Sequence, residues 1–174
     1  INCLDYATGK GIWGKKGNGI NVKGGPLQGT AYVGNDLVIA TGEKNNFIDI
    51  INTSNGMSNL AKPVKVDGAV KYLEILPCGI LFATNEEVNI IHSSSGEKII
   101  PKSLESNDGL LSEHGGKKYV FNLKDNLVYE IEPVSGNAKS IGSVAVEFQG
   151  KEDATRAEAT NDGIVISSDQ NIAF

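Results

Sequence analysis

The chain has 174 residues, enough for one domain with a core or for an array of small repeats. Its net charge of −5 comes without an acidic or basic block, so no basic stripe offsets nucleic-acid phosphates and no nucleic-acid binding is expected. No apolar run approaches the length of about 18 residues that a membrane-spanning helix needs. With 21 glycines and 5 prolines, the composition is typical of a chain rich in turns and strands.

The stretch Leu4–Trp13 predicts a short strand, a tight turn that closes on Gly9, and the start of a second strand. The same pattern returns three times, with turns that close on Gly56, Gly96 and Gly136, so successive glycines are 47, 40 and 40 residues apart. A small polar residue precedes each glycine, as expected for a turn whose last position has a positive φ angle. A repeat of about 40 residues built from short strands is typical of β-propeller blades.

Each later repeat also contains two apolar runs separated by a few Asn, Asp or Gly residues, which predicts a β-hairpin. The first run is apolar almost throughout, as in a strand covered on both faces. These first runs are Leu37–Thr41, Ile80–Thr84, Tyr119–Phe121 and Ile164–Ser168. Further strands are expected before the hairpins (29–33, 69–76, 109–112) and after the turn glycines (10–13, 57–61, 97–102, 137–144). The Ala- and Glu-rich stretch 152–160 lacks an apolar stripe and is interpreted as loop and strand.

The predicted fold is therefore all-β, a β-propeller segment of about four blades, each a four-stranded antiparallel sheet. The repeats fall approximately at residues 1–26, 27–66, 67–106 and 107–146, with a partial repeat at 147–174. Ile1 and Ile172 occupy the same strand position of the repeat, so the two ends cannot fill one slot in a single four-bladed ring. We expect the rest of a propeller of about seven or eight blades, or a second copy of the chain, to pair with the open blade edges.

The segment Leu4–Trp13 resembles the repeat of the quinoprotein-like (pyrroloquinoline-quinone-like) β-propellers, whose pattern is roughly Ala-x-Asp-x-x-Thr-Gly-Lys-x-x-Trp. The other three repeats keep the glycine and the apolar strand but replace Asp5 and Trp13. Asn52, His92 and Glu132 stand at the first position, and Leu60, Ile100 and Ser140 stand at the second. The resemblance implies either a quinone-dependent dehydrogenase or a cofactor-free scaffold, and the loss of the tryptophans argues against blade docking of the enzyme type. It also implies a periplasmic or extracellular location.

Few residues are candidates for chemistry. Trp13, the one tryptophan, is expected on an outer strand, where it packs between blades. His92 and His114 are isolated from each other and from any Cys cluster, so no transition-metal site is expected. Cys3 and Cys78 are expected to be unpaired thiols. Residues 14–29 predict a blade connection and not a phosphate loop. Residues 107–109 and 161–163 predict turns and not calcium loops.

The remaining candidate for function is a surface. Propellers bind partners through the loops that connect their strands, and the longest polar insertion here is 151–161. Its charged residues are Glu152, Asp153, Arg156 and Glu158. The favoured interpretation of this insertion is an ordinary solvated face, and the alternative is a contact surface. The predicted function is a non-catalytic scaffold that binds a protein or ligand through its loop faces without a cofactor. The competing hypothesis is a fragment of a quinone-dependent dehydrogenase whose catalytic residues lie outside this chain.

Overall fold

The computed structural model describes residues 1–101, 110–123, 125–144, 154–168 and 172–173. These residues form strands and turns, with one short 3₁₀ turn, η1 (Lys15–Gly17). The strands make antiparallel sheets, four of them in the described part of the chain. Within the same part, no helix is long and apolar enough to cross a membrane.

Each sheet is built from strands that follow one another along the chain. The first sheet contains β1 (Leu27–Val33), β2 (Asp36–Gly42), β3 (Asn46–Asn52) and β4 (Val64–Val66). The second contains β5 (Tyr72–Leu76), β6 (Gly79–Ala83) and β7 (Val88–Ile91). The third contains β8 (Leu110–His114), β9 (Lys117–Asn122), β10 (Leu127–Ile131) and β11 (Ala138–Ser143). The fourth contains β12 (Arg156–Ala159), β13 (Ile164–Ser167) and β14 (Ile172–Ala173).

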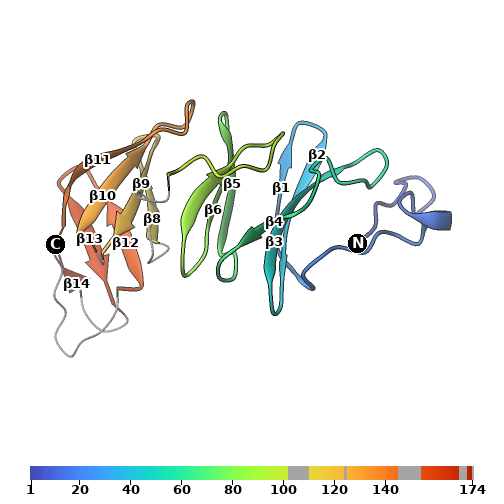
Figure 1. Cartoon of the computed structure of the whole chain (residues 1–174), viewed down its shortest axis with the longest axis horizontal. Helices are drawn as coiled ribbons and strands as arrows, with labels where there is room; N and C mark the ends of the chain where they lie inside the picture. Colours follow the sequence, from blue (N-terminus) through green and yellow to red (C-terminus); the bar gives the residue numbers. More distant parts are fainter. Residues whose placement is uncertain (102–109, 124, 145–153, 169–171, 174) are drawn as a thin grey trace.

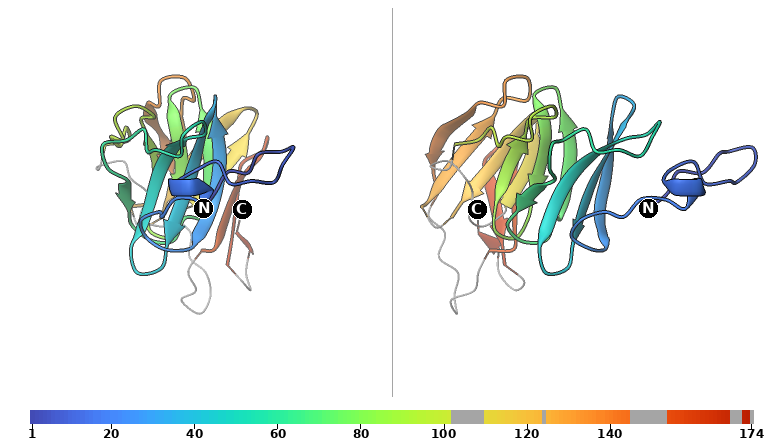
Figure 2. Two further views of the ribbon diagram at one scale, coloured as in Figure 1. Left: turned by 90° about the vertical axis from the view of Figure 1, so that its right-hand side faces the viewer. Right: turned by 45° about the vertical axis from the view of Figure 1, so that its right-hand side comes forward.

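The sheets stand side by side in an open row (Figure 1). The first strand of one sheet lies against the first strand of a neighbouring sheet, so that β1 contacts β5 and β8 contacts β12. Figure 2 shows the sheets following one another face to face, with the N-terminal segment projecting beyond the first sheet. The N-terminal segment and the fourth sheet therefore lie at opposite ends of the row.

Apolar side chains fill the spaces between successive sheets. Strand β6 is buried along its whole length, and its alternate side chains face opposite neighbours. Ile80 and Phe82 pack against the first sheet, whereas Leu81 and Ala83 pack toward the third sheet. A further cluster joins the third and fourth sheets through Phe121 and Ile166. A strand covered on both faces has to be apolar throughout, which explains the continuous apolar runs of the sequence.

The four turns that close on glycine share one geometry. The φ angles of Gly9, Gly56, Gly96 and Gly136 are 67°, 74°, 75° and 74°. In each turn the glycine amide donates a hydrogen bond of 2.8 to 2.9 Å to the carbonyl four residues earlier. The side chain of that earlier residue accepts backbone bonds from inside the turn, as Asp5 Oδ1 does from Thr8 N at 2.8 Å. The turn therefore satisfies its own backbone groups, and its last position favours glycine.

In the first and second sheets, the outermost strand differs from the one expected from the sequence. Residues 57–61 form only an isolated bridge between Ile51 and Ser58, and the fourth strand appears later as β4. Residues 97–101 likewise form a single bridge, between Ile91 and Lys98. Side chains interrupt this second ladder, because Asn89 Oδ1 accepts a bond from Ile100 N at 3.1 Å and Asn89 Nδ2 donates to Ile100 O at 3.3 Å. Backbone groups bonded to a side chain cannot extend the strand pairing.

Candidate functional site

Two of the charged residues in the long polar insertion lie on β12, the first strand of the fourth sheet. Arg156 and Glu158 sit two positions apart on one face of the strand and form an ion pair between Nη2 and Oε1. Their side chains are 71% and 50% exposed, so this pair faces solvent. Glu152 and Asp153 lie outside the described residues. The structure thus places half of the predicted charged set on a regular strand.

An open groove of about 500 Å³ runs between β8 and β12, and its walls are residues 111–113 and 156–159. Two contacts fix the spacing of these walls. The amide of Ala159 donates to Ser112 Oγ at 2.9 Å, and His114 Nε2 lies 2.8 Å from Asn161 Oδ1. The groove therefore has exposed charges of both signs on two strands that are bonded to each other. We call it the β8–β12 groove.

A buried lysine joins the second and third sheets beside this groove. Lys118 on β9 has a side chain only 4% exposed, and its Nζ lies 2.6 Å from Glu74 Oε2 on β5. The same ammonium group pairs with Glu113 on β8, which also lines the β8–β12 groove. Burial lowers the pKa of Lys118, but the hydrogen bonds to Glu113 and Glu74 outweigh burial and hold that pKa above its usual value. Lys118 is therefore a charged joint between sheets.

Tyr72 completes the surroundings of this lysine. Its hydroxyl donates to Glu74 Oε2 and accepts a bond of 3.4 Å from Lys118 Nζ. Burial, followed by the hydrogen bond to Glu74, raises the pKa of Tyr72 above its usual value. The phenol therefore stays protonated at neutral pH and acts as a hydrogen-bond donor.

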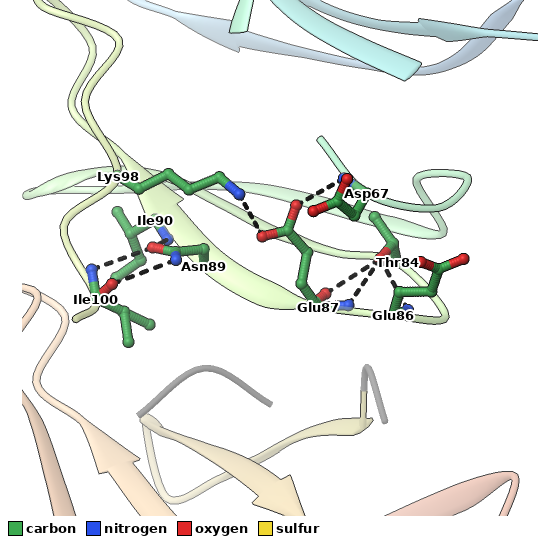
Figure 3. A network of polar contacts seen from close by, with 8 residues as sticks. All are labelled: Asp67, Thr84, Glu86, Glu87, Asn89, Ile90, Lys98 and Ile100. Atoms are coloured by element: carbon green, nitrogen blue, oxygen red, sulfur yellow. Dashed lines mark hydrogen bonds and ion pairs between the residues drawn. The ribbon is translucent and has the colours of Figure 1, made fainter. Parts of the chain in front are cut away.

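A second polar joint connects the first and second sheets (Figure 3). The carboxylate of Glu87, whose side chain is 6% exposed, pairs with Lys98 through Oε2. Its Oε1 accepts a bond of 2.8 Å from the amide of Asp67, just after β4. Thr84 Oγ1 accepts bonds from the amides of Glu86 and Glu87 at 3.0 and 2.9 Å, which shapes the turn between β6 and β7. This carboxylate is fully engaged in holding two sheets together.

The residues singled out individually from the sequence lie in packing or turn positions. Trp13 lies in a bend and not on the expected outer strand. It is 3% exposed, and its Nε1 donates to the carbonyl of Thr53 at 2.7 Å, so it packs onto the first sheet. His92 Nδ1 lies 3.0 Å from Ser94 Oγ inside its turn. Cys3 and Cys78 are both unpaired. Residues 107–109 fall outside the described part of the chain, and residues 161–163 form the bend before β13.

The described residues contain no group of three or more His, Cys, Asp or Glu side chains able to hold a metal ion. They do contain Lys118 and Glu87, two functionally informative residues that the sequence reasoning missed. The alternation of β9 carries a usable signal, because Lys118 is in phase with Val120 and Asn122, which are buried. A lysine at an inward-facing position of a strand predicts a paired buried charge.

No family model matches the chain, and no curated protein matches its sequence. Among solved structures, the computationally designed Ika4 protein is similar with a TM-score of 0.56 at 9% identity, covering 95% of this chain and 97% of Ika4. The designed Ika8 protein gives 0.56 at 10% identity over 98% of this chain and 50% of its own. The N-terminal domain of Nup159 gives 0.53 at 8% identity over 82% and 39%.

β-Propeller proteins are among these similar structures, and the stacked antiparallel sheets agree with them. The chain has a β-propeller fold. This confirms the fold class predicted from the spacing of the turn glycines. The chain spans half of Ika8 and 39% of the Nup159 domain. Since identity is 10% or less in each case, the similarity establishes the propeller architecture alone.

Proposed function

We propose that this propeller is a non-catalytic scaffold that binds a protein partner at the β8–β12 groove. The observation that carries the proposal is the placement of Glu113, Arg156 and Glu158 on two neighbouring strands. These strands are joined by the hydrogen bond from Ala159 N to Ser112 Oγ. Charges held on a rigid backbone offer a fixed pattern to a complementary surface without a large ordering cost. Arg is also the charged residue most enriched at protein interfaces.

The buried charges of the chain support a scaffold over a catalyst. Lys118 and Glu87 each bridge neighbouring sheets and are already paired with groups of opposite charge. A general acid or base needs a group that can exchange its proton with a substrate near neutral pH. The raised pKa of Lys118 moves it away from that range. These residues therefore serve to fix the relative positions of the blades.

We also propose that the chain belongs to the cofactor-free type of quinoprotein-like propeller and supplies the repeats outlined from its sequence. Supporting this, Trp13 docks its repeat on the next one through a bond to a carbonyl 40 residues away. The hairpin around Gly9 leaves apolar side chains exposed, with Leu4 60% and Ile12 49% accessible. Further blades of the same protein, or a second copy, are the proposed cover for this hairpin.

Site-specific photo-crosslinking tests the binding proposal. Glu158 is replaced by p-benzoylphenylalanine in the protein expressed in its native host, and Lys139 on β11, which is exposed, is the matched control position. We expect one discrete protein adduct at position 158, and its loss when Arg156→Glu is added. Equal labelling at both positions, or no adduct at position 158, contradicts the proposal.

A further inference from the structure

A second groove lies at the edge of the first sheet that is formed by β4, opposite the edge formed by β1. It has a volume of about 540 Å³ and is bounded by the start of β3, by residues 61–65, which include the start of β4, and by the turn at Gly96 that follows β7. None of its lining residues belongs to the β8–β12 groove. We call it the lysine groove because Lys23, Lys62 and Lys65 line it.

The floor of the lysine groove is apolar. Phe47 is 8% exposed, and Pro63 and Val64 are half-buried beside it. The turn at Gly96 lies flat against Val64, since a Cβ added to Gly96 would come within 3.0 Å of Val64 Cγ2. The floor is therefore built from strand residues and from a turn of fixed geometry, and it joins two blades.

The rim of the groove carries three lysines. Within the described part of the chain, Lys23, Lys62 and Lys65 make no ion pair. Other exposed lysines, such as Lys10 and Lys139, are also without an ion pair there, and what sets these three apart is that they line one groove. The ammonium of Lys23 is held 4.4 Å from the centroid of the Phe47 ring, which directs this charge over the apolar floor. The carboxylate closest in sequence to Gly96 is that of Glu97, whose Oε2 accepts a bond of 3.4 Å from Ser95 Oγ.

We infer that the lysine groove binds an acidic, extended peptide segment of a partner protein that carries an apolar side chain. Three unpaired lysines in a chain of net charge −5 form a local positive field that attracts carboxylates. The apolar floor accepts a leucine-like side chain, and this burial adds affinity that a bare anion cannot gain. Lysine ammonium groups pair with carboxylates from several directions, which suits a flexible acidic segment.

Fluorescence anisotropy of a labelled, glutamate-rich peptide with two central leucines tests this assignment. The reference probes are the same peptide with serine in place of each leucine, the same peptide with lysine in place of each glutamate, and a labelled single-stranded DNA. The test variant is Lys62→Glu with Lys65→Glu. The matched control is Lys10→Glu with Lys139→Glu, which changes the net charge equally at two exposed lysines outside the groove. Circular dichroism verifies that both double variants stay folded.

We expect the acidic leucine peptide to bind the wild type, and the groove variant to weaken that binding by about tenfold or more, which corresponds to about 1.4 kcal/mol. The control variant should change affinity by less than about twofold, because screening limits the reach of distant surface charges. Loss of the leucines should weaken binding, and the lysine peptide should not bind. Equal binding by both variants, no binding by the wild type, or preference for the DNA overturns the inference. The β8–β12 groove is untouched by these changes, so the two proposals fail independently.

Discussion

The indole ring of Trp13 lies directly on Gly56, the turn glycine of the next repeat. A Cβ added to Gly56 would come within 2.7 Å of the indole Cγ, and the indole Nε1 donates to Thr53 O at 2.7 Å in the same turn. The turn glycine thus has two roles, because it supplies a positive φ angle and leaves space for a side chain of the preceding repeat. Leu60 and Ile100 hold the position of Trp13 in later repeats and are buried as well, at 5% and 3% exposure.

Replacing Gly56 by alanine should separate these two roles when it is compared with Gly9→Ala. Gly9 has a φ angle of 67° and no atom within 4 Å of an added Cβ, so its substitution should cost about 1 kcal/mol through backbone strain alone. Gly56→Ala adds a clash with Trp13, and we expect a loss of about 3 kcal/mol. Urea unfolding monitored by Trp13 fluorescence measures both. Equal losses for the two variants would show that the contact with Trp13 costs nothing.

The neighbouring lysines 117 and 118 provide a second comparison. Lys118→Met removes a buried cation that two carboxylates face, and we expect a loss of about 2 kcal/mol, less than for a fully buried pair because Glu113 is 56% exposed. Lys117→Met removes an exposed partner of Glu130 at 3.0 Å, and stability should hardly change. Chemical denaturation at pH 7 measures both variants. A result in which Lys118→Met is as mild as Lys117→Met would contradict the role of Lys118 as a joint between sheets.

The pKa of Lys118 also predicts the pH range of this contribution. Because the pKa of Lys118 in the folded protein lies above the usual lysine value, its contribution to the free energy of unfolding is fully present at any pH below that usual value. It is lost only as the pH rises through the folded-state pKa. The difference in stability between wild type and Lys118→Met should therefore be constant from pH 7 to about pH 10 and should decline in more alkaline solution.

Asp49 should behave in the opposite way to a stabilising carboxylate. Burial raises its pKa above the usual aspartate value, although the bonds from Ser58 Oγ and Ile50 N lower it. The folded state therefore binds the proton more tightly than the unfolded state, and ionised Asp49 costs stability at neutral pH. Asn89 stands at the same place in the next repeat, and its Oδ1 likewise accepts from the following amide at 2.8 Å.

Asp49→Asn is consequently expected to raise the midpoint of thermal unfolding at pH 7 by about 2 °C. The advantage should disappear as the pH falls through the usual aspartate range, since both proteins are then neutral at this position. Calorimetry across this pH range checks the prediction. A lower midpoint for Asp49→Asn at pH 7 would mean that the charge itself stabilises the fold.

How far the sequence predicted this molecule depends on the range of the interaction. The turns at Gly56, Gly96 and Gly136 could be predicted from the sequence because they depend on a few adjacent residues and on the φ freedom of glycine. The central strands could also be predicted, because burial on both faces requires continuous apolar runs in the sequence. Strands that depend on long-range pairing were harder to predict from the sequence. The strand pairing does not continue beyond β7, because the side chain of Asn89 forms hydrogen bonds with the backbone N–H and C=O of Ile100. No local sequence pattern predicts this contact.

The candidate site could be predicted only in part from the sequence, for the same reason. The charged insertion directed attention to Arg156 and Glu158, but its composition does not reveal that they face Glu113 across a groove. That neighbour comes from a strand more than 40 residues earlier in the chain. Glu74 and Lys118 are likewise brought together only by the stacking of two sheets. Contacts between blades are set by tertiary packing, which periodicity within one strand does not encode.

The scaffold proposal predicts an absence of quinone chemistry. Purified protein should bind no pyrroloquinoline quinone and should oxidise no alcohol after reconstitution with Ca²⁺. The measurements are the absorbance of co-purified quinone and the reduction of an artificial electron acceptor. A quinone-dependent dehydrogenase tested in parallel is the positive control. Activity at its level would support the dehydrogenase hypothesis in place of the scaffold.

The central claim is that successive sheets stack as blades with β8 and β12 side by side, and a disulfide test addresses it most directly. Ser112 Oγ and Ala159 N are 2.9 Å apart across the two sheets. In a protein with Cys3→Ser and Cys78→Ser, the pair Ser112→Cys and Ala159→Cys should form an intramolecular disulfide under mild oxidation. The pair Ser112→Cys and Lys139→Cys, with its second thiol on β11, should remain reduced. Mass spectrometry of tryptic fragments identifies the linkage. Efficient linkage of the first pair alone is the predicted result; no linkage, or equal linkage of both pairs, would contradict the stacked-blade account.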